Sequence, residues 1–245
     1  MKSIYKISGI ALLFLIFACT DNFEDINTND TTIPKNQLEA TDFFAGMFNN
    51  IYQNQPAWST QLQQNLNGDV YSGYMMPPTG FASNINNMTY ALVDGWNNFP
   101  WNVAYSNIML NAFTIEGISK ETNPKLYALS LILKVEAMHR VTDIYGPIVY
   151  SRFGENPLVG YYDSQETVYN TFFEELDYAI TTLSDSSLPD VPGTFAATDQ
   201  AYGGDIDKWV QFANSLRLRL AIRISKVNPS KAQTEGEKSL AHSGG

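Results

Sequence analysis

The sequence has few of the residues on which metal and redox chemistry depend. Its 245 residues include one cysteine and two histidines, and only 16% of them are charged. A single cysteine excludes an internal disulfide, and two histidines leave little material for a metal centre. There is also no phosphate-binding G-x-x-x-x-G-K loop and no dinucleotide fingerprint. We therefore expect neither a cofactor nor a metal site.

Positive charge is also scarce. The chain has 15 basic and 25 acidic residues, which gives a formal net charge of −10. Nucleic acid and anionic lipid are bound by basic surfaces, so neither is expected as the main partner. Hydrophobic residues reach 44% and aromatic residues 13%, so most of the chain should fold. The polar residues are largely Asn, Gln, Ser and Thr, as is common in proteins that face sugars.

The first long hydrophobic run ends at the single cysteine. Lys2 and Lys6 precede an apolar run over residues 7–17, which is about half the length that a membrane-spanning helix needs. This pattern predicts a signal peptide over residues 1–18. Residues 15–19 (LIFAC) resemble the bacterial lipobox, in which the thiol of Cys19 is acylated. The alternative is a buried thiol, which is not expected at the edge of a leader.

An acidic and polar tether is expected over residues 19–35. Its start, residues 20–25 (TDNFED), resembles the signal by which some Bacteroidetes send lipoproteins to the cell surface. Two or more acyl chains on one cysteine give stable membrane attachment. The sequence thus predicts a protein that is held by lipid at the outer membrane and exposed at the surface.

From residue 36 onward the hydrophobic pattern is mostly helical. The fold class predicted is all-α, a TPR-like solenoid of helix pairs with long irregular loops. Asn123-Pro124 and Asp163-Ser164 are typical helix starts. The helical pattern that starts at residue 232 is cut short near the C-terminus, so we expect residues 36–245 to be the N-terminal part of a longer helical domain. Helices are expected over residues 37–52, 101–117, 125–144, 165–183, 208–227 and from 232, with loops over 65–100 and 184–204.

Two groups of polar residues were weighed for chemistry. His139 and Asp143 are four residues apart, as in a two-ligand metal site, but no third ligand follows at a useful spacing. Glu174, Glu175 and Asp177 are the residue types of a glycosidase pair, but on a helix they are more typical of a solvated face.

The charges of Glu136, Arg140 and Asp143 are expected to neutralise one another. Asn214, in the interior of a helix, is expected to hydrogen-bond a neighbouring loop.

The best candidate for ligand binding is the loop over residues 65–101. Sugars are held by aromatic rings against their C–H faces, with amides and carboxylates bonded to the hydroxyl groups. The loop offers the right residue types, and the alternative is that some of them only pack on helices. The candidate ligand-binding residues are Asp69, Tyr71, Tyr74, Trp96 and Asn97.

Three stretches together resemble the SusD/RagB family of nutrient-binding outer-membrane lipoproteins. They are the lipobox followed by residues 23–29 (FEDINTN), residues 138–150 (MHRVTDIYGPIVY) and residues 208–223 (KWVQFANSLRLRLAIR). The resemblance covers nearly the whole chain, and members of the family are about twice as long. It implies a scaffold of TPR-like helix pairs. It also implies capture of an oligosaccharide or peptide for a SusC-like TonB-dependent transporter, without catalysis.

Two other functions stay open. One is a TPR-like scaffold that binds another protein and no nutrient. The weaker one is a surface glycosidase that uses Glu174 or Glu175.

Overall fold

The computed structural model describes residues 37–52, 56, 58–156 and 158–243. The predicted signal peptide, Cys19 and the tether lie outside this part of the chain. The described residues form helices and one short antiparallel hairpin, in which β1 (Ile148–Val149) pairs with β2 (Tyr162–Asp163). The prediction of an all-α fold is confirmed.

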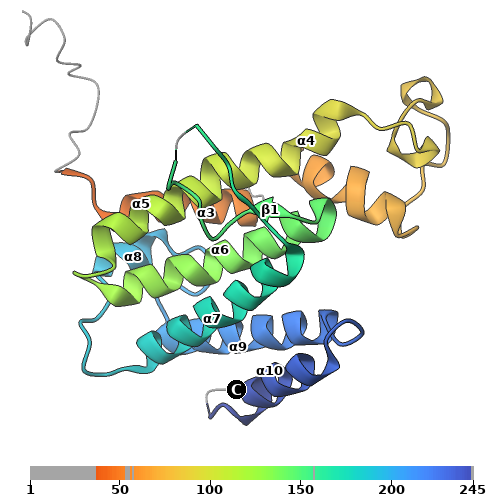
Figure 1. Ribbon diagram of the computed structural model, residues 1–245. Coiled ribbons are helices and arrows are strands. Elements are labelled where there is room, and N and C mark those ends of the chain that lie inside the picture. The colour runs from red at the N-terminus through yellow and green to blue at the C-terminus, as the bar shows by residue number, and fades with distance from the viewer. Residues whose placement is uncertain (1–36, 53–55, 57, 157, 244–245) are drawn as a thin grey trace, which may run out of the picture. The chain divides into compact units, whose positions relative to one another are not determined.

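The long helices follow one another as a stack of neighbours. Each packs against the next along the chain: α5 on α6, α6 on α7, α7 on α9 and α9 on α10 (Figure 1). This is the arrangement of helix pairs that the periodicity predicts. The elements are η2 (Ala40–Phe43), α3 (Phe44–Ile51), η3 (Gln61–Asp69), η4 (Ala82–Asn84), η5 (Asn87–Thr89), α4 (Asp94–Val103), η6 (Ala104–Met109), α5 (Leu110–Ser119), α6 (Pro124–Tyr145), α7 (Gln165–Ser184), α8 (Gly193–Thr198), α9 (Ile206–Arg223) and α10 (Pro229–Ala241).

Side-chain caps set the starts of the four longest helices. Asn123, Ser164, Asp205 and Asn228 each accept a hydrogen bond from the backbone N–H three residues later, at 3.1–3.2 Å. Such a cap satisfies a donor that has no partner within the helix and contributes about 1 kcal/mol. Gly146, with a φ of +78°, ends α6 in a conformation that favours glycine.

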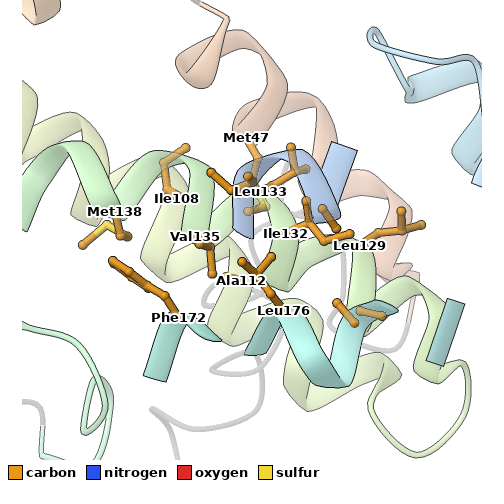
Figure 2. Close-up of a cluster of buried hydrophobic side chains, with 14 of the residues drawn as sticks. Met47, Ile108, Ala112, Leu129, Ile132, Leu133, Val135, Met138, Phe172 and Leu176 are labelled. Carbon is orange, nitrogen blue, oxygen red and sulfur yellow. The ribbon is translucent and has the colours of Figure 1, made fainter. Parts of the chain in front are cut away.

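The core is built around α6, which is apolar on nearly every side. Phe172 and Leu176 of α7 approach it from one side, and Ile108 and Ala112 approach from the η6–α5 segment (Figure 2). Met47 of α3 belongs to the same cluster. Burial of a large apolar side chain is worth roughly 1.5–3 kcal/mol. The packing of α6 against its neighbours is therefore the main source of stability in the described residues.

Several boundaries differ from those expected, and α9 ends at Arg223 rather than at residue 227. The loop predicted over residues 65–100 is helical at both ends, because η3 extends to Asp69 and α4 begins at Asp94. A short helix, α8, interrupts the loop predicted over residues 184–204. The last helix begins at Pro229 and not at residue 232, because Asn228 both follows α9 and caps α10.

Two predicted partnerships were wrong in detail. Glu136 does pair with Arg140 at 2.9 Å, but Asp143 pairs with Arg223 of α9 at 2.6 Å. The side-chain nitrogen of Asn214 donates to the carbonyl of Val210 in its own helix at 3.2 Å and not to a loop. Asp143 is thus paired with a residue of another helix, whereas the side chain of Asn214 bonds within its own helix.

One ion pair is largely buried between α6 and α7. The Lys134 ammonium lies 2.6 Å from Glu175, and both side chains are about 85% shielded from solvent. The Tyr150 hydroxyl donates to the other oxygen of Glu175 at 2.5 Å, and the Lys134 ammonium lies 4.7 Å from the centre of the Tyr150 ring. Burial and the neighbouring Glu175 carboxylate raise the pKa of Tyr150 well above its usual value.

Replacement of this lysine should be costly. We expect Lys134→Met to lower the free energy of unfolding by about 3 kcal/mol, because it leaves the buried carboxylate of Glu175 without its cation. Lys120→Met is the matched control, since the Lys120–Glu116 pair is exposed on α5 and should cost less than about 1 kcal/mol. Urea unfolding followed by circular dichroism measures both. Equal losses in the two variants would contradict this account.

Candidate functional site

Exposed aromatic and apolar side chains gather in one loop. We call residues 70–93, which connect η3 to α4, the aromatic loop; it extends from the N-terminal end of α4 (Figure 1). Tyr74 and Tyr90 are 87% and 82% exposed, and Tyr71 is 45% exposed. Contiguous apolar patches that are exposed to solvent often mark binding surfaces. Other exposed members of the loop are Met75, Met76, Ile85 and Leu92.

The aromatic rings of the loop form pairs. The ring centres of Tyr71 and Tyr90 lie 6.1 Å apart at a tilt of 40°. Phe81 stacks on Trp96 of α4 with 6.1 Å between ring centres and 21° between planes. The first pair is exposed to solvent, whereas Phe81 and Trp96 are half-buried. The first pair is thus available to a ligand, and the second supports the loop from α4.

A buried asparagine connects the two ends of the loop. The side-chain nitrogen of Asn87 donates to the carbonyl of Leu66 at 2.6 Å and to the side-chain oxygens of Asn67 and Asn97 at 3.2 Å. Its side-chain oxygen accepts from the backbone N–H of Val93 at 3.2 Å. A buried amide needs such partners. Asn87 therefore holds η3 and α4 at a fixed separation.

The loop also contains strained backbone. Ala82, Ser83 and Asn84 have φ values of +49°, +55° and +57°, and Tyr90 has a φ of +57°. A non-glycine residue in this region costs about 1–3 kcal/mol and persists only where its surroundings impose it. Thr89 contributes to this constraint, since its hydroxyl donates to the carbonyl of Asn84 at 2.7 Å. Of the exposed tyrosines, Tyr90 is one of these strained residues.

The structure places Asp69, Tyr71 and Tyr74 where η3 passes into the aromatic loop. The two carboxylate oxygens of Asp69 accept hydrogen bonds from Gln64 and Asn65 at 2.8 and 2.7 Å. Tyr71 faces Tyr90, and Tyr74 stands almost free in solvent. These side chains all occupy the exposed side of the loop.

Trp96 and Asn97 lie in the first turns of α4. Trp96 is covered by Phe81, and the side-chain nitrogen of Asn97 donates to the carbonyl of Val93 at 3.0 Å and to Asn87 at 3.3 Å. Asn87 thus joins this pair to η3. The ring of Trp96 and the side chain of Asn97 thus contact the aromatic loop, and the carbonyl of Asn97 accepts a hydrogen bond from the Tyr145 hydroxyl of α6.

The site residues predicted from the sequence do not include Tyr90, Phe81 and Asn87. Tyr90 completes the exposed ring pair, Phe81 covers Trp96, and Asn87 connects the two ends. A run of asparagines around residue 87 was the available signal, because amides are the side chains that bond to backbone in irregular segments. No pattern in the sequence indicates that Tyr71 and Tyr90 meet.

Most of the residues considered for metal binding and glycoside hydrolysis form ion pairs or hydrogen bonds with other residues, whereas Glu174 is exposed. Asp143 binds Arg223, and His139 contacts the carbonyl of Val135 at 3.2 Å. Burial lowers the pKa of His139. Among the described residues there is no group of three His, Cys, Asp or Glu side chains that could hold a metal ion. Of the three carboxylates, Glu175 binds Lys134, and Asp177 binds Arg217 and Lys238.

Within the described part of the chain, no helix combines the length and the apolar character that a membrane crossing requires.

Comparison with known proteins gives a consistent result. Residues 21–245 match the SusD-like family model, described as Susd and RagB outer membrane lipoprotein. Among solved structures, a chitin-binding SusD homolog from Flavobacterium johnsoniae is 52% identical with a TM-score of 0.78, over 84% of this chain and 43% of that one. A SusD homolog from Bacteroides vulgatus is 38% identical with a TM-score of 0.71, over 84% and 42%. No curated protein matches the chain.

A further solved structure, titled a chitin-binding protein, is 29% identical with a TM-score of 0.60, over 82% of this chain and 42% of that one. The chain thus spans about two fifths of the length of the structures that it matches. The family model covers nearly all of its residues, and its helical stack superposes on solved members. The chain belongs to the SusD-like family.

Proposed function

We propose that the protein is a surface lipoprotein that captures an oligosaccharide of the chitin class at the aromatic loop. In this proposal Cys19 carries the lipid that anchors it to the outer membrane, and a SusC-like TonB-dependent transporter receives the ligand. The membership of a family of outer-membrane lipoproteins supports the location. The chain carries out no catalysis in this proposal.

The observation that carries the proposal is the exposed pair of Tyr71 and Tyr90. Sugar rings present flat C–H faces that pack on aromatic side chains, and their hydroxyl and acetamido groups bond to amides and carboxylates. The loop that carries this pair also contains asparagine side chains, and the carboxylate of Asp69 lies directly before it. A relative that is 52% identical is a chitin-binding protein by its title, which supports an N-acetylated sugar as the ligand.

The predicted residues take different parts in this site. Tyr71 and Tyr90 hold one sugar ring, and Tyr74 extends the surface toward a second ring. Asp69 has its carboxylate positioned by two amides and accepts from a sugar hydroxyl. Trp96 and Asn97 stay proposed ligand residues, and they reach the sugar at the edge of α4.

Strain and the buried amide serve the same purpose in the proposal. A loop that is already fixed in its binding conformation loses little entropy when a ligand arrives, so more of the contact energy appears as affinity. The turn at Ala82–Asn84 and the network of Asn87 supply that rigidity. The loop then acts as a preformed platform.

Removal of the ring pair should weaken glycan binding. We expect Tyr71→Ala and Tyr90→Ala each to raise the Kd for chitohexaose about five- to tenfold, because one aromatic contact is worth about 1 kcal/mol. Isothermal titration calorimetry with the protein at its full natural length measures the change. Tyr178→Ala is the matched control, since Tyr178 is a partly exposed tyrosine of α7 that packs on Tyr127.

If the two loop variants bind chitohexaose as tightly as the unmodified protein, the aromatic loop is not the site. If the unmodified protein binds no glycan at all, the chitin class is wrong.

The buried amide can be tested separately. We expect Asn87→Ala to speed hydrogen exchange in residues 61–97 and to raise the Kd for chitohexaose, because it leaves several buried polar groups without a partner, at a cost of about 1–3 kcal/mol. Exchange in α6 and α7 should not change, since these helices are stabilised by their own packing. Hydrogen exchange read by mass spectrometry measures both regions. Asn102→Ala is the control, because Asn102 is exposed on α4. Unchanged exchange in the loop would show that Asn87 does not hold it.

A scaffold that binds another protein is the second candidate, favoured by the stack of helix pairs. Co-purification of a large outer-membrane transporter together with glycan binding supports the first proposal. Protein binding without any glycan binding supports the scaffold.

A further inference from the structure

A cavity is lined by residues near the ends of α6 and α9 and near the starts of α7 and α10. Figure 1 shows these helix ends away from the aromatic loop. We call this cavity the polar cavity. Its volume is about 500 Å³, which is within the range of small-molecule sites. Four helices contribute to its walls. The lining residues that matter here are Asp143, Glu166, Tyr169, Asn170, Arg223 and Lys231.

One wall holds an arginine in a fixed position. The guanidinium of Arg223 lies 2.6 Å from Asp143, and its Nε donates to the Tyr169 hydroxyl at 3.2 Å. That hydroxyl in turn donates to Asp143 at 2.7 Å. Arg223 has five N–H donors, and these contacts use only part of them. Because the side chain is about half exposed, its remaining donors are accessible from the cavity.

Another lining residue, Lys231 of α10, is a cation without a counterion among the described residues. Each of the other described lysines and arginines has a carboxylate oxygen within 3.2 Å, except for the exposed Lys226. Lys231 has no such partner among the described residues. It is half-buried, and its ammonium lies 5.5 Å from the centre of the Phe173 ring. Lys231 lines the polar cavity of a chain whose net charge is −10, and its lack of a carboxylate partner leaves it available to an anionic ligand.

We propose that the polar cavity binds a small ligand through its carboxylate, which Lys231 and the free donors of Arg223 hold together. Hydrogen bonds between charged groups are about twice as strong as neutral ones, and a fixed arginine is suited to a planar carboxylate. Asn170 has no hydrogen-bond partner in the described residues and supplies an amide to the rest of the ligand. Glu166 is exposed at the rim and repels a second negative charge, so the ligand carries one carboxylate.

Two kinds of small molecule share this chemistry: a uronic acid sugar and a short peptide with a free C-terminus. The test uses the protein at its full natural length and titrates D-glucuronate, alanyl-alanine, and glucose as a neutral probe, by calorimetry. We expect one of the two carboxylates to bind and glucose not to bind at the same concentration. Which carboxylate binds tells the two sources apart.

Variants locate the binding. Lys231→Met should raise the Kd of the carboxylate at least about tenfold, since it removes a charge-assisted hydrogen bond. Lys226→Met removes the same charge from an exposed position outside the cavity and should leave the Kd unchanged. Val227→Glu adds a negative charge at the rim, on a side chain that is 83% exposed, and should weaken binding without affecting the fold.

Three results would overturn the proposal. They are binding of neither carboxylate, binding of glucose with equal affinity, and equal losses in Lys231→Met and Lys226→Met. The test does not depend on the aromatic loop, because Tyr90→Ala should leave carboxylate binding intact.

Discussion

The burial of α6 on all sides is the constraint on which the rest of the structure depends. A helix that is apolar nearly all round is stable only when neighbours cover each face, and α5, α7 and α3 do so. The few charged residues of α6 must then find partners within α6 or on the helices around it, because an unpaired buried charge is costly. Lys134 finds Glu175, and Glu136 finds Arg140 and Arg219. The neighbouring helices are thus arranged so that they cover the apolar surface of α6.

This rigid stack allows the aromatic loop to be irregular. The loop is anchored at both ends by helices, since η3 packs against α4 and α4 continues through η6 into α5. Both η3 and η6 are π-helical, a rare form that is frequent at functional sites. The free-energy cost of the strained backbone at residues 82–84 is offset by the packing around α6, which stabilises the described residues independently of the loop. Stability and the proposed ligand contact thus belong to different parts of the chain.

Much of the scaffold could be predicted from the sequence, because its signals are local. Asn123-Pro124 predicts the start of α6, and the apolar periodicity predicts its burial. The partner of Asp143 could not be predicted in this way, because Arg223 is 80 residues away and the local rule favours Arg140. The pair of Tyr71 and Tyr90 was not predicted for a related reason, since Tyr90 adopts a left-handed backbone conformation. A tyrosine in that conformation is set by tertiary contacts and not by its own preference.

The stretches that carry the family resemblance now have a physical explanation. Residues 138–150 include Asp143, residues 208–223 include Arg219 and Arg223, and the pairs Glu136–Arg219 and Asp143–Arg223 connect α6 directly to α9. These contacts align two helices that are separated by α7 along the chain. None of these residues lies in the aromatic loop. Relatives between 26% and 52% identical share the stack, so likeness in these stretches indicates the scaffold and does not by itself identify a ligand.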